Sequence, residues 1–127
     1  MHQRKFGQTG FSVSEVGLGT WQVGDSWRNK INEHDAMAIF RSAVEHGVNF
    51  FDTADVYGAG RSEKLIGKFL KETTEEVFVA TKLGRLGGYP DNYSLEFVQK
   101  CIENSLKRLN KEALDLVVAH SICGEHV

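Results

Sequence analysis

Three ionisable side chains stand at the ends of apolar segments of this sequence. The segments are Val48–Asp52, Val77–Lys82 and Leu114–His120. Each apolar run is typical of a buried β-strand. In parallel α/β architectures the carboxyl ends of the strands point to one common face, where catalytic groups gather. A carboxylate, an ammonium and an imidazole would therefore converge on one site, which indicates an enzyme.

A tyrosine adds a fourth chemical group near the first of these strand ends. Tyr57 lies five residues beyond Asp52. This distance gives the chain room to turn and to point the phenol back over the strand. The strand ends and the following loop thus predict a site that contains both a cation and a proton donor.

Each of these residues also has a purely structural interpretation when it is taken alone. Asp52 could cap a turn, and Lys82 could be a solvated strand end. Tyr57 could pack against other side chains, and His120 could be a core histidine with a satisfied hydrogen bond. Their joint occurrence, in order and at strand ends, favours the functional interpretation.

The elements that must position these groups alternate along the chain. Arg4–Phe6 and Phe11–Val13 flank a glycine turn and predict a hairpin that covers one end of a sheet. A first strand is expected over Val16–Trp21, and helices are expected after the N-caps Asn32, Ser62 and Ser94. Their apolar stripes are Met37, Ile39, Phe40, Ala43 and Val44; Leu65, Ile66, Phe69 and Leu70; and Phe97, Val98, Cys101, Ile102, Leu106 and Leu109.

This alternation of strands and helices after a hairpin predicts an α/β fold with a parallel sheet and right-handed crossovers. We expect a single domain over residues 1–127. A closed eight-stranded barrel typically needs about 250 residues, so the chain would hold half of one. An open sheet is the alternative. A flavodoxin-like domain would suit this length, but the sequence has no phosphate-cradling loop after the first strand.

The composition argues against several classes of function. The formal net charge is −2, so nothing favours nucleic-acid or membrane binding. No apolar stretch approaches the ~20 residues that span a bilayer, and Met1–Gly7 lacks the apolar core of a signal peptide. We expect a cytoplasmic protein with no metal site, in which Cys101 and Cys123 are reduced.

Four segments together resemble the aldo-keto reductase family. Phe51–Gly67 is similar to the signature of that family. Three further segments agree with it in order: Gly17–Trp21, Val79–Lys82, and Ser105–Leu109 followed by Leu114–Leu116 and His120. The resemblance extends over residues 4–120, which is nearly the whole chain.

The resemblance implies a parallel (β/α) barrel of the TIM-barrel type. This chain would hold its N-terminal half, with about four strands and three helices after the hairpin. The family transfers hydride between NADP(H), or NAD(H), and small carbonyl substrates, so the implied function is the reduction of aldehydes or ketones. The family's catalytic tetrad falls on Asp52, Tyr57, Lys82 and His120.

The resemblance also assigns binding roles at the first strand. Trp21 resembles the aromatic wall beside the nicotinamide, and Gly19 and Thr20 would lie near the cofactor together with Asp52. Trp21 would also contact the substrate, together with Tyr57 and His120.

General chemistry accounts for these residue types. A carbonyl that receives hydride develops charge on its oxygen and needs a positioned proton donor. A free tyrosine titrates near pH ~10, so a phenol donates poorly at neutral pH without a neighbouring cation. Lys82 would supply that cation, Asp52 would orient it, and His120 would bind the carbonyl oxygen.

The chain departs from the family's pattern after His120, where four further strand-helix units would follow. In the family, that half supplies most of the contacts to the cofactor. The alternative function is therefore a non-catalytic binding or regulatory subunit. Strands at both edges of a half barrel would be open, which favours self-association.

Overall fold

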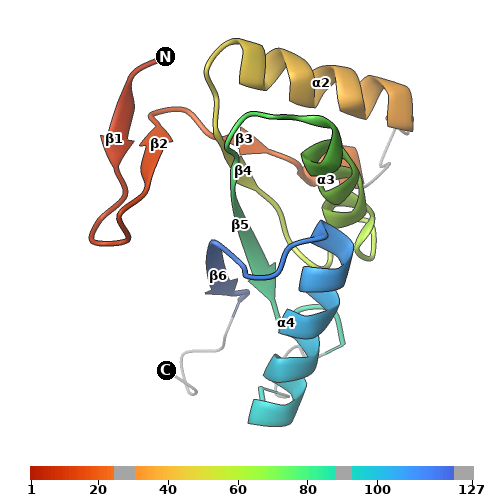
Figure 1. Ribbon diagram of the computed structural model, residues 1–127. Helices are drawn as coiled ribbons and strands as arrows, with labels where there is room; N and C mark the ends of the chain where they lie inside the picture. Colours follow the sequence, from red (N-terminus) through yellow and green to blue (C-terminus); the bar gives the residue numbers. More distant parts are fainter. Residues whose placement is uncertain (25–30, 88–92, 122–127) are drawn as a thin grey trace.

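The computed structural model describes residues 1–24, 31–87 and 93–121, and its elements follow the expected alternation (Figure 1). They are β1 (Gln3–Lys5), β2 (Ser12–Ser14), β3 (Leu18–Gly19), α1 (Trp21–Gly24), α2 (Glu33–Glu45), β4 (Phe50–Asp52), α3 (Arg61–Glu72), β5 (Phe78–Leu83), α4 (Leu95–Leu109) and β6 (Leu116–Ala119). Cys123 and His126 lie outside the described residues. None of the described helices is long and apolar enough to cross a bilayer.

The main sheet has four parallel strands in the order β3-β4-β5-β6. Helices α2, α3 and α4 lie on the same side of it (Figure 1). Right-handed crossovers that always advance in one direction place every connecting helix on one face. A flavodoxin-like sheet instead reverses its strand order and carries helices on both faces. The strand order therefore excludes that alternative and fits a segment of a barrel wall.

The hydrophobic core lies between this sheet and the helices. Three phenylalanine rings form its centre: Phe40 lies 5.5 Å from both Phe51 and Phe69, and the latter two are 6.0 Å apart. Since side chains alternate along a strand, Phe51 on the helix side directs Asp52 to the opposite, helix-free face. The same alternation separates Thr81 from Lys82 in β5. The packing of the core thus fixes the direction in which the chemical groups point.

The hairpin β1–β2 covers the amino-terminal ends of the parallel strands, as the sequence predicts. Phe6 packs on Phe50 with ring centroids 5.6 Å apart, and Phe11 packs on Phe78 at 4.5 Å. Asn49 accepts a hydrogen bond from the Ser14 N–H through Oδ1. The hairpin therefore closes the end of the sheet opposite to the candidate site.

Two of the three predicted N-caps are confirmed. The Asn32 side chain accepts the N–H of Asp35, and the Ser94 side chain accepts the N–H of Phe97. The prediction for Ser62 was wrong, because α3 begins two residues earlier than this cap requires, at Arg61 after the N-cap Gly60, whose φ is 88°. The hydroxyl of Ser62 is fully buried and is held by other side chains, so it does not cap the helix.

The first parallel strand is also shorter than predicted. It pairs with β4 only over Leu18–Gly19, and the chain then curls into α1, with the Gly24 N–H donating to the Thr20 carbonyl. Trp21 therefore begins a helical turn instead of ending the strand. In α2, Ile39 lies outside the buried stripe and is 36% exposed, contrary to the prediction.

Helices α3 and α4 approach closely at a glycine. A Cβ built on Gly67 would lie 2.2 Å from the carbonyl oxygen of Arg108. Alanine normally stabilises a helix interior by about 1 kcal/mol relative to glycine. Here we expect Gly67→Ala to lower the free energy of unfolding by about 1–3 kcal/mol, because the helices must separate. Urea unfolding measures the change. Gly19→Ala, where a Cβ meets nothing within 4 Å, is the control, and an unchanged or raised stability of Gly67→Ala would contradict the prediction.

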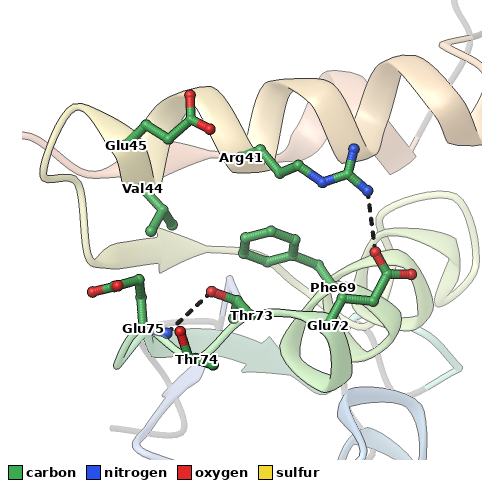
Figure 2. A pocket seen from close by; sticks show the side chains of 8 residues that line it. All are labelled: Arg41, Val44, Glu45, Phe69, Glu72, Thr73, Thr74 and Glu75. Atoms are coloured by element: carbon green, nitrogen blue, oxygen red, sulfur yellow. Dashed lines mark hydrogen bonds and ion pairs between the residues drawn. The ribbon is translucent and has the colours of Figure 1, made fainter.

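A cavity of about 230 Å³ lies between α2 and the end of α3 (Figure 2). Phe69 forms its apolar wall, and the Arg41–Glu72 ion pair spans one side at 3.1 Å. Its lining includes Thr73, Thr74 and Glu75, which lead into the amino-terminal end of β5. The cavity is therefore at the opposite end of the sheet from the strand-end side chains.

Candidate active site

The strand-end residues predicted from the sequence come together at the carboxyl edge of the sheet. Asp52 is the last residue of β4, Lys82 is the penultimate residue of β5, and His120 directly follows β6. The Lys82 ammonium is the centre of the cluster. It donates to Asp52 Oδ1 at 2.5 Å, to the Thr53 carbonyl at 2.9 Å and to the Tyr57 hydroxyl oxygen at 3.3 Å.

These three contacts use all three protons of a lysine ammonium. The Lys82 side chain is 19% exposed, whereas that of Asp52 is 42% exposed. The cation is thus held inside the site while its carboxylate partner faces outward. Since the Tyr57 oxygen accepts from Lys82, its own O–H must point elsewhere and is available as a donor.

His120 completes the cluster from β6. Its backbone N–H donates to the Leu83 carbonyl at 2.9 Å, and its own carbonyl accepts the Tyr93 hydroxyl at 3.0 Å. The imidazole meets the Tyr57 ring edge-on, with centroids 6.3 Å apart. Its Nδ1 is buried and has no hydrogen-bond partner within the described part of the chain. The ring is therefore fixed by its backbone and by packing.

The environment of His120 favours a neutral imidazole. Burial lowers its pKa from 6.5, and the nearby cations Lys82 and Arg85 lower it further. A neutral ring has one N–H donor and one acceptor nitrogen, so it can donate one hydrogen bond to a substrate.

We expect an NMR titration to place the pKa of His120 below 6.5. The unfolded chain then binds the proton first, so the histidine makes folding less favourable as the pH falls below about 6.5. Lys82→Met removes one of the neighbouring cations and should move the pKa back toward 6.5. A titration of the unmodified chain at or above 6.5 would contradict this interpretation.

The loop between β4 and α3 places Tyr57 above the strand ends. Its N–H donates to the Ala54 carbonyl at 3.2 Å. The loop also packs tightly against α1, since a Cβ on Gly24 would lie 2.7 Å from the Tyr57 backbone. Gly58 has a φ of 61°, and a Cβ there would lie 2.0 Å from the Gly24 carbonyl oxygen. Two glycines therefore allow the approach that fixes the tyrosine.

A chain of hydroxyl groups supports the site from the helix side. Thr53 donates to Ser62 at 2.9 Å, Ser62 donates to Thr20 Oγ1 at 2.8 Å, and Thr20 donates to the Asp52 carbonyl at 2.8 Å. Thr53, Ser62 and Thr20 are each fully buried. This chain joins the ends of β3 and β4 to the start of α3.

The residues predicted near a cofactor differ in their exposure. Gly19 is exposed with open space beside it, and Trp21 is 47% exposed. The Thr20 side chain instead points into the buried hydroxyl chain. Gly19 and Trp21 are therefore accessible to a ligand, whereas Thr20 supports the backbone of Asp52.

Sequence reasoning missed the buried polar residues beneath the site. Thr53, Asp55 and Ser62 are each at most 2% exposed. One signal could have identified Thr53, because the alternation that directs Asp52 to one face must direct its neighbour to the other. No comparable local signal exists for Ser62, whose partners lie up to 42 residues away.

The family model "Aldo/keto reductase family" matches residues 15–127. The chain therefore belongs to the aldo/keto reductase family, and its four-stranded sheet is part of the barrel of that family.

Individual relatives agree with this assignment. The chain is 41% identical over 122 residues to L-galactose dehydrogenase from Arabidopsis thaliana, covering 94% of this chain and 38% of the relative. An aldo-keto reductase from Bacillus halodurans superposes with a TM-score of 0.78 at 32% identity, covering 92% and 39% of the two chains. One from Klebsiella pneumoniae, solved in complex with NADPH, superposes with a TM-score of 0.72 at 28% identity, covering 87% and 36%. The chain thus spans less than half the length of these relatives.

Proposed function

We propose that the protein containing this chain is an NADP(H)-dependent oxidoreductase that reduces aldehydes or ketones to alcohols. The observation that carries the proposal is the Lys82 ammonium, held by Asp52 at 2.5 Å while donating to the Tyr57 oxygen at 3.3 Å. A phenol beside a desolvated, oriented cation is suited to donate a proton to an oxygen that becomes negatively charged.

Each side chain then has a distinct task. The free O–H of Tyr57 donates to the carbonyl oxygen, and the electron density left on the phenol is stabilised by Lys82. Asp52 orients the ammonium through their hydrogen bond. His120, as a neutral imidazole across the edge of the Tyr57 ring, donates a hydrogen bond to the same carbonyl oxygen and orients the substrate.

The accessible groups at the end of β3 fit a nicotinamide ring. The indole of Trp21 offers a flat apolar face, and Gly19 leaves open space beside the backbone. Asp52 completes this surface with its exposed carboxylate. When bound, a nicotinamide cofactor supplies the hydride. The Klebsiella pneumoniae relative, solved with NADPH, supports NADP(H) as the cofactor.

We also propose that both edges of the sheet pair with further strands when the protein acts. Among the described strands, β3 and β6 each have a neighbour on one side only. Val117 and Val118 of β6 are 37% and 42% exposed. A second copy of the chain, or further strands of the same barrel, would cover these groups.

Titration of the purified chain with NADPH, followed by nucleotide fluorescence, tests this function. We expect a saturable change, and Trp21→Ala should weaken binding by about tenfold because it removes the aromatic face. Ile39→Ala, which shortens an exposed side chain on α2, is the matched control and should bind as the unmodified chain does. Light scattering in parallel gives the mass of the species that binds. Absence of binding by any assembled form would contradict the proposal and favour a non-catalytic role.

A further inference from the structure

Asp55 is a buried carboxyl group with no role in the chemistry proposed above. It is 2% exposed and lies in the loop that carries Tyr57. Its Oδ2 accepts the N–H of Gly84 at 3.2 Å, and its own N–H donates to the Lys82 carbonyl at 2.9 Å. The residue therefore touches the backbone on both sides of the end of β5.

These contacts continue the hydrogen-bond ladder between β4 and β5. Thr53 donates its N–H to the Ala80 carbonyl at 2.8 Å, and Asp55 donates to Lys82 two residues further on. In a parallel ladder the next bond would run from the Gly84 N–H to a backbone carbonyl. The Asp55 carboxylate accepts that N–H instead, because the loop has turned away toward α1.

The Asp55 carboxyl lies in a buried environment with charged neighbours. Burial raises the pKa of Asp55, with a further contribution from Glu63, while the Gly84 N–H and Arg108 act in the opposite direction. The Cys101 thiol of α4 and the His120 imidazole are further titratable groups close enough to interact with it. Oδ1 is buried without a hydrogen-bond partner in the described ranges. Burying a carboxyl group costs free energy of folding unless the group is hydrogen-bonded. The position of Asp55 is therefore not that of a solvent-exposed turn residue.

Gly84 also lies close to Tyr93, which is hydrogen-bonded to His120. Gly84 has a φ of 101°, and a Cβ there would lie 2.2 Å from the Tyr93 ring. The Tyr93 hydroxyl in turn donates to the His120 carbonyl. One side chain thus connects the Tyr57 loop, the Lys82 strand end and the segment that holds His120.

We propose that Asp55 is a positioning residue, whose carboxylate replaces a backbone carbonyl in the β4–β5 ladder and thereby fixes Tyr57 above Lys82. The catalytic consequence rests on the proposed function. The structural part, a hydrogen bond between Asp55 and Gly84 that holds the loop, can be measured without activity.

Amide hydrogen exchange on the 127-residue chain tests the structural part. We expect Asp55→Ala to speed exchange of the Gly84 amide by about tenfold, as expected for the loss of one hydrogen bond, while the Thr53 amide stays protected. Asp55→Asn keeps an acceptor oxygen and should retain the protection. Equal exchange at Gly84 in all three proteins would overturn the inference.

A second measurement does not depend on the alanine variant folding. In the unmodified chain the Gly84 amide proton shift should follow the titration of the Asp55 carboxyl, and it should be flat with pH in Asp55→Asn. A Gly84 shift that does not change with pH in the unmodified chain would also overturn the inference.

Kinetics then separate positioning from catalysis. In an active form, Asp55→Ala should lower kcat with little change in KM for NADPH, and Asp55→Asn should restore most of kcat. If exchange at Gly84 responds as expected but no form reduces a carbonyl compound, the proposed function fails and the Asp55 contact stands. If kcat of Asp55→Ala equals that of the unmodified protein, the positioning role fails.

Discussion

Replacing Tyr57 with phenylalanine is expected to lower the rate of carbonyl reduction by about 10²–10⁴-fold, the usual contribution of a positioned acid. The substitution keeps the ring that packs edge-on against His120 at 6.3 Å, so the surrounding structure should stay intact. It removes only the oxygen that accepts from Lys82 and the proton that it would donate. Affinity for NADPH should therefore change little. Oxidation of NADPH in the presence of an aldehyde measures the rate.

Tyr93→Phe is the matched control for this experiment. It removes a hydroxyl close to His120, but one that donates to the His120 carbonyl instead of accepting from Lys82. We expect at most about a tenfold loss, in line with a single hydrogen bond to the backbone. Full activity in Tyr57→Phe, or equal losses in the two variants, would contradict the role of Tyr57 as proton donor.

Replacing Arg108 with methionine is expected to destabilise the protein by about 3–5 kcal/mol, the cost of breaking a buried ion pair from one side. Arg108 Nε donates to Glu63 Oε2 at 2.5 Å, and the side chain of Glu63 is completely buried. Its other oxygen accepts the Thr81 hydroxyl at 2.6 Å. Without the arginine, the carboxylate would stay buried without its cation. Urea unfolding measures the change in free energy.

Two further variants test the cause. Lys107→Met removes the charge of an exposed neighbouring residue on α4. It should change the free energy of unfolding by no more than about 0.5 kcal/mol. Combining Arg108→Met with Glu63→Gln removes the unpaired charge and should recover part of the loss. If Arg108→Met unfolded at the same urea concentration as Lys107→Met, the ion pair would have no stabilising role.

The layout of the fold could be predicted from sequence because it depends on local patterns. Apolar runs that alternate with helical spacing predicted the order of the hairpin, the four parallel strands and helices α2, α3 and α4, although not the short helix α1. The N-caps Asn32 and Ser94 follow from side chains three residues from their partners. The convergence of Asp52, Lys82 and His120 follows from one further rule, that parallel strands end at a common edge. Their catalytic role remains a prediction.

The features that could not be predicted depend on distant partners. Ser62 looks like a cap in sequence, but a hydroxyl 42 residues away holds it in the core. The burial of Glu63 depends on Arg108, which is 45 residues away. The buried carboxylate of Asp55 accepts the N–H of Gly84, which is 29 residues away. None of these pairings leaves a periodic signal in the sequence.

The pleat of β5 assigns neighbouring residues to opposite faces. Val79 belongs to the core, and Thr81 bonds to the buried Glu63, whereas Lys82 faces the opposite side with Asp52. Selection on the chemistry of the site and selection on the packing of the core therefore act on interleaved positions whose side chains lie on opposite faces of the strand. Such a strand can change what it binds one residue at a time without losing stability, which makes it a suitable starting point for the evolution of new specificities.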